Sequence, residues 1–174
     1  MKQPTTPEEL WELHDLLRRD PQEHLRVVNQ WIDDNPLDPH PYFDRHFTWM
    51  ELGEPRRALD DMNTSIKLEP DRYSYLARGE VHRHLGEYEQ ATQDFARAEA
   101  MDPESWQRDA IGLLFQADAH ARLGQEQEAL DCCKRLPDDF WTPGMLGAPG
   151  GGKAEIADEL RRRAFKARRG RSQT

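Results

Sequence analysis

One spacing constrains this chain more than any other, because the same residue types return every 33 positions. Gly53 and Gly86 are 33 residues apart, and the alanines five residues after each of them keep the same interval. A third glycine, Gly124, is likewise followed by an alanine at the fifth position. A recurrence of this length is the signature of stacked supersecondary units, so the spacing predicts a fold built from repeated elements.

The unit from Tyr75 to Pro103 shows how each period is organised. Its first helix carries bulky, small and aromatic-like residues on one face, and Gly86 ends that helix. Ala91 and Phe95 lie one turn apart on a second helix, which Pro103 stops. Runs rich in Val, Ile and Thr that would form strands are absent, so we expect an all-α fold.

This arrangement resembles the tetratricopeptide repeat, whose pattern is W-x2-L-G-x2-Y, then A-x3-F, then P, over about 34 residues. The positions that carry the resemblance are Tyr75, Gly79, His82, Ala91, Phe95 and Pro103. The unit before it carries Tyr42, His46, Trp49, Ala58 and Met62, and the unit after it carries Leu113, Ala117, His120, Ala129 and Cys133. Two residues depart from the pattern, Arg78 in the leucine position and His46 in the glycine position.

The resemblance implies a single α-solenoid domain over residues 1–174, with about four helix pairs and a C-terminal capping helix. The expected repeats are roughly 5–38, 39–71, 72–104 and 105–136, followed by a Pro/Gly-rich loop at 137–152 and the capping helix at 153–169. The first repeat matches the pattern poorly, because terminal repeats are usually atypical. The first helix of the fourth repeat is expected to begin near Glu104 or Ser105 and to be longer than its counterparts.

In proteins of this family the first helix of each pair lines a concave groove, and the groove-facing residues lie between the consensus positions. The resemblance therefore implies these partner-binding residues: Phe43, Phe47, Met50, Tyr73, Leu76, Glu80, Arg83, His84, Ile111, Leu114, Asp118 and Arg122. Their apolar members would form a floor flanked by charges, which suits an amphipathic helix or an extended apolar segment. The alternative is that the closing helix or the loop around Trp141 occupies this surface itself.

We therefore expect a non-enzymatic protein-protein interaction module whose partner is another protein or peptide segment, in a scaffold, chaperone-like or toxin-immunity role. No cofactor or metal is expected, because the histidines and cysteines lack H-E-x-x-H and C-x-x-C spacing. His82 and His120 take the aromatic position of their repeats and are expected in the core. Cys133 takes the phenylalanine position, and nothing near Cys132 suggests a catalytic partner.

An alternative function is nucleotide or phosphate binding through the glycine-rich loop that ends at Lys153. Residues 147–154, GAPGGGKA, fit the G-x-x-x-x-G-K part of a phosphate-binding loop. Ala154 replaces the Ser or Thr that would hold Mg²⁺, and no strand is predicted before the loop. A flexible connection into the closing helix is the simpler interpretation.

The net charge of −9 hides an asymmetry that raises one more alternative. Residues 153–174 hold eight Lys/Arg and three Asp/Glu, a balance of +5, and the remainder holds sixteen against thirty, a balance of −14. The basic helix could associate with nucleic acid, although an acidic body favours internal pairing. The opening MKQPTTPEEL lacks the apolar core of a secretory signal and no apolar run could span a membrane, so we expect a cytoplasmic protein.

Overall fold

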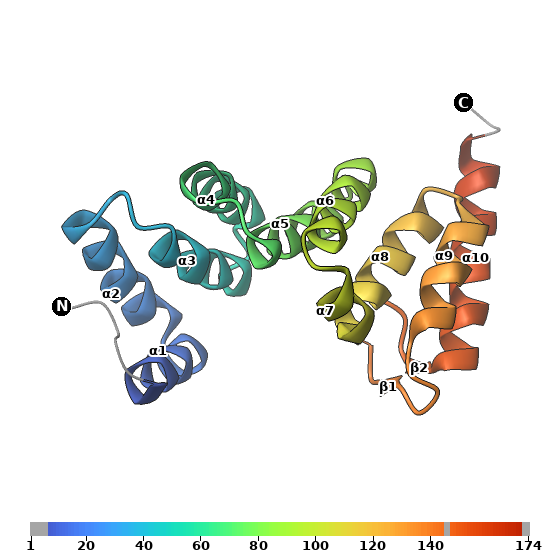
Figure 1. Ribbon diagram of the computed structural model, residues 1–174, viewed down its shortest axis with the longest axis horizontal. Coiled ribbons are helices and arrows are strands. Elements are labelled where there is room, and N and C mark those ends of the chain that lie inside the picture. The colour runs from blue at the N-terminus through green and yellow to red at the C-terminus, as the bar shows by residue number, and fades with distance from the viewer. Residues whose placement is uncertain (1–6, 145–146, 172–174) are drawn as a thin grey trace. The chain divides into compact units, whose positions relative to one another are not determined.

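The computed structural model describes residues 7–144 and 147–171, and its contacts divide the chain into two compact units, Met1–Ser74 and Tyr75–Thr174 (Figure 1). Helices make up most of both units, which confirms the all-α helical-repeat prediction. The expected start of the first repeat at residue 5 lies outside the described residues. That the chain forms a single domain stays a prediction.

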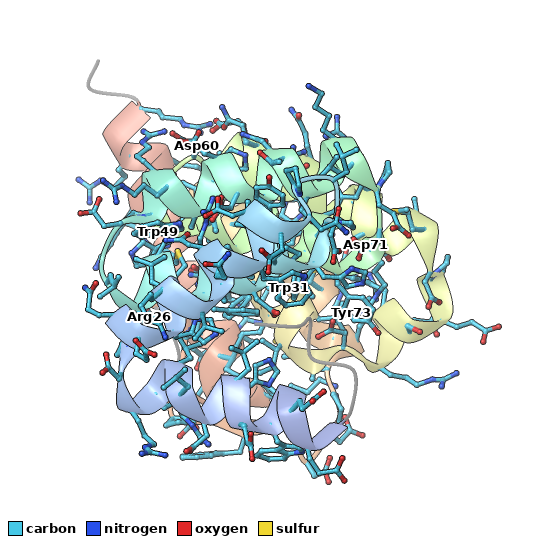
Figure 2. All side chains as sticks on the ribbon, turned by 90° about the vertical axis from the view of Figure 1, so that its left-hand side faces the viewer. Arg26, Trp31, Trp49, Asp60, Asp71 and Tyr73 are labelled. Carbon is cyan, nitrogen blue, oxygen red and sulfur yellow. The ribbon has the colours of Figure 1, made fainter. Side chains whose placement is uncertain are left out.

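The first unit contains α1 (Pro7–Arg19), α2 (Pro21–Asp34), α3 (His40–Glu51), α4 (Pro55–Leu68) and the first turn of α5 (Arg72–His84). α1 packs against α2, α2 against α3, and α3 against α4. Asp20 begins α2, because its carboxylate accepts a hydrogen bond from the amide of Glu23. Trp31 packs with Leu13 and Val28 in the core between α1 and α2 (Figure 2).

The second unit contains the rest of α5, then α6 (Tyr88–Met101), α7 (Pro103–Arg108), α8 (Ala110–Arg122), α9 (Glu126–Arg135), β1 (Trp141–Thr142), β2 (Gly151–Gly152) and α10 (Lys153–Arg171). The two short strands pair antiparallel, with Trp141 opposite Gly152. The last helix, α10, begins at Lys153 and packs against both α8 and α9. Its buried residues join one core with Phe95 and Trp106.

Three glycines end the first helix of the second, third and fourth repeats in the same way. Gly53, Gly86 and Gly124 have φ of 73°, 78° and 76°, in the left-handed region that favours glycine. In each case the amide of the next residue donates a hydrogen bond to the carbonyl five residues before it, at 2.8 to 2.9 Å. This is the Schellman ending of a helix, so each glycine turns the chain from the first to the second helix of its pair.

The fourth repeat differs from the sequence expectation, because its first helix is broken. Asp109 separates α7 from α8, and its carboxylate accepts a 2.8 Å hydrogen bond from the amide of Gly112. The break accompanies complete burial of Trp106, whose ring centroid lies 6.2 Å from that of Phe95. The prediction of one long helix is therefore wrong, since the cap at Asp109 starts a new helix after one short one.

The arginine in the leucine position of the repeat pattern belongs to an ion pair inside the helix pair. Arg78 on α5 holds Asp94 on α6 with Nε–Oδ2 and Nη2–Oδ1 distances of 2.7 and 2.8 Å. Arg45 and Asp61, each 33 residues earlier, form the same two bonds at 2.8 and 2.6 Å between α3 and α4. Both carboxylates are buried. The departure from the pattern is thus a recurring bidentate pair rather than a defect of packing.

The glycine position also differs between repeats, and the residue facing it accounts for the difference. A Cβ on Gly79 would lie 2.7 Å from the ring of Phe95, so glycine is required in that repeat. The preceding repeat has Met62 in place of the phenylalanine, and it accommodates His46, which is 2% exposed. A flexible, narrow methionine leaves space that a phenyl ring would fill.

Candidate partner-binding site

The twelve residues predicted to bind a partner differ widely in exposure. Four are exposed, namely Phe47, Tyr73, His84 and Ile111. Five are half-buried, namely Phe43, Met50, Leu76, Glu80 and Arg122. Three are buried, namely Arg83, Leu114 and Asp118. Phe43, Phe47, Met50 and Tyr73 belong to the first unit, and the other eight residues belong to the second.

Three predicted groove residues of the second unit are not available to a partner, which corrects the sequence expectation. Leu114 has no exposed surface and belongs to the core around α8. Asp118 has none either, because Arg83, Arg122 and Arg163 all contact its carboxylate. The guanidinium of Arg83 also stacks over the ring of Phe115, 4.3 Å from its centroid.

The loop before α10 and α10 itself cover this side of α8. The carbonyl of Gly147 accepts hydrogen bonds from Arg122 on α8 at 3.2 Å and from Arg163 on α10 at 2.8 Å. The next residue, Ala148, is buried in the same core as Leu114. The alternative that the chain occupies its own surface thus describes this part of the second unit, because the loop and α10 supply contacts that a partner would otherwise make.

In the first unit, α3 presents a row of aromatic side chains that the chain leaves partly open. Phe43 and Phe47 meet edge to face with their ring centroids 5.5 Å apart, and Phe47 is 39% exposed. His46 lies behind them with its ring centroid 3.9 Å from that of Phe47, and its Nδ1 donates to the carbonyl of Phe43. Burial lowers the pKa of His46 to about 4, so the imidazole is neutral near pH 7. It therefore packs against the phenyl rings as an uncharged ring.

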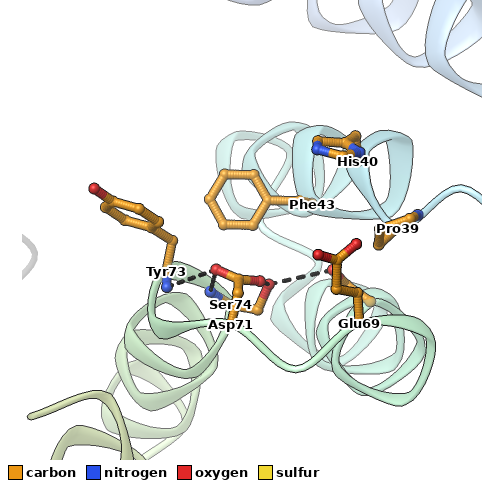
Figure 3. Close-up of a pocket in the computed structure, with 8 residues that line it drawn as sticks. Pro39, His40, Phe43, Glu69, Asp71, Tyr73 and Ser74 are labelled. Atoms are coloured by element: carbon orange, nitrogen blue, oxygen red, sulfur yellow. Dashed lines mark hydrogen bonds between the residues drawn. The ribbon is translucent and has the colours of Figure 1, made fainter. Parts of the chain in front are cut away.

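A pocket of about 350 Å³ opens beside Phe43, between α3 and the connection from α4 to α5 (Figure 3). Its lining consists of Pro39, His40, Phe43, Ser65, Glu69, Asp71, Tyr73 and Ser74. Asp71 starts α5 by accepting hydrogen bonds from the amides of Tyr73 and Ser74 at 2.8 and 3.1 Å, and from the Ser74 hydroxyl. Tyr73 is 60% exposed at the mouth.

The carboxylate of Asp44 on α3 is held in an environment that disfavours its charged form. Burial raises the pKa of Asp44 to about 6, and the nearby Asp38 adds to the rise. His14 and His40 oppose this rise by favouring the charged form. The first unit therefore carries a desolvated acidic group next to its exposed aromatic row.

The glycine-rich loop uses its polar groups internally rather than leaving them for a phosphate. Lys153 Nζ donates to the carbonyl of Leu136 at 2.8 Å and to Asp138 at 2.9 Å. The amide of Gly152 donates to the carboxylate of Glu155 at 2.7 Å. Since a bound phosphate would need this lysine and these loop amides, the geometry argues against the nucleotide alternative.

The basic residues of α10 are mostly paired with acidic residues of the second unit. Their partners are Asp158 for Arg161, Glu159 for Arg162 and Arg163, Asp118 for Arg163, Glu126 for Arg168 and Glu89 for Arg171. The pairs with Asp158 and Glu159 lie within α10, and those with Asp118, Glu126 and Glu89 connect α10 to the acidic body. This pairing leaves little unbalanced charge on α10 for a nucleic-acid backbone.

Within residues 7–144 and 147–171, no three His, Cys, Asp or Glu side chains are grouped so that they could hold a metal ion. Burial raises the pKa of Cys132 to about 12, so this thiol stays protonated and unreactive. In the same part of the chain, no helix is both long and apolar enough to cross a bilayer.

Sequence reasoning missed most of the pocket, because four of its lining residues lie in or next to the α4–α5 connection. Ser65 is in the last turn of α4, and Glu69, Asp71 and Ser74 surround the proline that ends that helix. The repeat pattern assigns these positions only to helix ends. The carboxylates of Glu69 and Asp71, on either side of Pro70, were the feature of the sequence that could have indicated an acidic wall here.

Residues 73–105 match the family model described as the tetratricopeptide repeat. The chain therefore contains a tetratricopeptide repeat over these residues. The solved structures agree in fold. A crystal structure of MamA superposes with a TM-score of 0.64 at 14% identity, over 92% of this chain and 96% of that one. TTC0263, a thermophilic TPR protein in Thermus thermophilus, gives a TM-score of 0.64 at 19% identity, over 94% and 82%.

A third solved structure, MamA 41-end from Desulfovibrio magneticus RS-1, has a TM-score of 0.64 at 17% identity and covers 91% of this chain and 92% of that one. Identities this low show the fold and not a shared partner. The tetratricopeptide repeat itself supports a protein-protein interaction module, because such repeats present extended surfaces to other polypeptides.

Proposed function

We propose that this tetratricopeptide-repeat protein is a non-enzymatic module that binds a segment of another polypeptide on the α3 face of its first unit. The observation that carries the proposal is the row of Phe43 and Phe47 beside a pocket whose mouth exposes Tyr73. Partly exposed aromatic side chains next to a pocket are typical anchors for a partner, since aromatic residues dominate binding hot spots. By contrast, the chain covers its own α8 surface in the second unit.

The bound segment is expected to be a helix or an extended chain with apolar anchors. Phe43, Phe47 and Met50 follow one another at helical spacing, so their side chains form a stripe along α3. A stripe of this kind accepts the apolar side of an amphipathic partner. Scaffold, chaperone-like and toxin-immunity roles would all use this mode of binding, and the identity of the captured protein decides among them.

The test compares capture of cellular partners by the full-length protein and its surface variants. Phe47→Glu and Tyr73→Glu place a charge on the proposed surface, and both residues are exposed, so helicity should be unchanged. Phe165→Glu is the matched control, because Phe165 is 54% exposed on α10, outside the site. Affinity purification with quantitative mass spectrometry should show a partner that both site variants lose by about tenfold or more. Equal recovery by all three variants would overturn the proposal.

A further inference from the structure

We infer that the pocket beside Phe43 receives a basic side chain, arginine or lysine, of the bound segment. The inference rests on the proposed function and adds the chemistry of one anchor to it. In Figure 3 the rings of Phe43 and His40 lie on one side of the pocket and the carboxylates of Glu69 and Asp71 on the other. An aromatic wall opposite an acidic wall is an arrangement suited to a cation with a long apolar stem.

The aromatic wall favours a cation because ring faces carry partial negative charge. Tyr73 already shows this behaviour, since the guanidinium of Arg72 lies 5.0 Å from the centroid of its ring. Phe43 is half-buried, and its ring faces into the pocket. The methylene stem of a lysine or arginine can lie against Phe43 and Tyr73 while its charged head extends beyond them.

The acidic wall supplies the counter-charge for that head. Glu69 follows the last residue of α4 and is exposed. Asp71 accepts its hydrogen bonds from two amides and a hydroxyl, all of which are neutral donors. Two cationic or titratable neighbours flank the pocket. Arg72 stacks on Tyr73, and His40 bonds through Nδ1 to the buried carboxylate of Asp38 at 2.8 Å.

The size of the pocket and its two walls together exclude other anchors. A volume of about 350 Å³ is near the lower end for ligand pockets, so it suits one side chain rather than a folded element. An apolar anchor would cover the exposed carboxylate of Glu69 without pairing it, which costs free energy. An acidic anchor would be repelled by both Glu69 and Asp71.

The experiment starts with selection of random peptides displayed on phage against the full-length protein. The strongest peptide is then measured by fluorescence anisotropy, with each arginine replaced in turn by citrulline, a neutral residue of nearly the same shape. We expect one basic position to be enriched, and its loss to weaken binding by about tenfold or more. Glu69→Gln should weaken the arginine peptide similarly and leave its citrulline form unchanged. Glu54→Gln is the matched control, an exposed glutamate of the same unit outside the pocket.

The outcomes separate this inference from the function on which it rests. If selected peptides lose binding with Phe47→Glu but tolerate citrulline and Glu69→Gln, the basic anchor is wrong and the binding surface stands. Failure of the selection to enrich any peptide whose binding depends on Phe47 would overturn both. Dependence on Phe47, on the basic side chain and on Glu69 together supports both.

Discussion

Replacing Asp118 by asparagine is expected to be among the most damaging changes of a single side chain in this protein. Asp118→Asn keeps the size and shape of the side chain but removes its charge. In the wild type this carboxylate lies within 3.0 Å of Arg83 and 3.1 Å of Arg122, and it also pairs with Arg163. The substitution therefore tests whether a buried charge holds α5, α8 and α10 together.

The magnitude follows from the burial of the partners. The side chain of Arg83 is only 2% exposed and that of Asp118 is fully buried. Removal of one partner of a buried ion pair leaves an uncompensated charge in the interior and costs about 3–5 kcal/mol. For a chain of this size a loss of about 3 kcal/mol lowers the melting temperature by about 6–12 °C.

Thermal and urea unfolding followed by circular dichroism measures the loss, and hydrogen exchange locates it. Arg163 of α10 contacts both Asp118 and the carbonyl of Gly147. The substitution should therefore increase the exchange rates of amides in α10 more than those of amides in α6. Asp158→Asn is the control, since Asp158 is 71% exposed in its pair with Arg161 and exposed pairs contribute little.

Two results would refute the reasoning. One is an Asp118→Asn variant whose unfolding free energy lies within about 1 kcal/mol of the wild type, the range of an exposed pair. The other is a double variant, Asp118→Asn with Arg83→Met, that is no more stable than the single variant. The double variant also removes the most buried of the three guanidinium groups that contact Asp118, so stability should partly return if that charge is the cause.

Two further predictions concern stability, one from a packing contact of Gly79 and one from the buried charge of Asp44. Gly79→Ala is expected to lose about 1–3 kcal/mol, because its Cβ would lie 2.7 Å from the ring of Phe95. Gly170→Ala, which meets no atom within 4 Å, should instead gain about 0.5 kcal/mol, and equal melting temperatures of the two variants would contradict the packing argument. Asp44→Asn should gain about 1–3 kcal/mol at pH 7, because burial raises the pKa of Asp44 from 3.8 to about 6 and penalises its charged form. This gain should disappear as the pH falls from about 6 to 4 in urea titrations, whereas the exposed Asp60→Asn control should show neither effect.

Much of the fold was readable from the sequence because it is local. A glycine with positive φ ends one helix and allows the next to begin, so the 33-residue period predicted the turns at Gly53 and Gly86, and the five-residue interval to the next alanine predicted the turn at Gly124. The helix from Lys153 likewise has acidic residues in its first turns and basic residues in its last, which is a local pattern. These features depend on residues within a few positions of each other, and spacing along the chain records them directly.

The ion pair between Arg78 and Asp94 lies at the limit of what spacing could predict. Arg45 and Asp61 repeat both residues 33 positions earlier, so the period contained the signal. Only coordinates show that each arginine meets its aspartate across a helix pair, with both bonds under 3 Å. A recurring residue type indicates a shared role but not the atoms that it contacts.

The exposure of the candidate site was decided by tertiary contacts alone. Asp118 and Leu114 occupy groove positions by sequence, but a loop and a helix from much later in the chain cover them, and Arg163 reaches Asp118 across 45 residues. The pocket of Phe43 and Glu69 likewise forms only when α3 meets the end of α4. Periodicity assigns a residue to a face of its helix. Whether that face meets solvent depends on what packs against it, and segments distant in the chain supply those contacts.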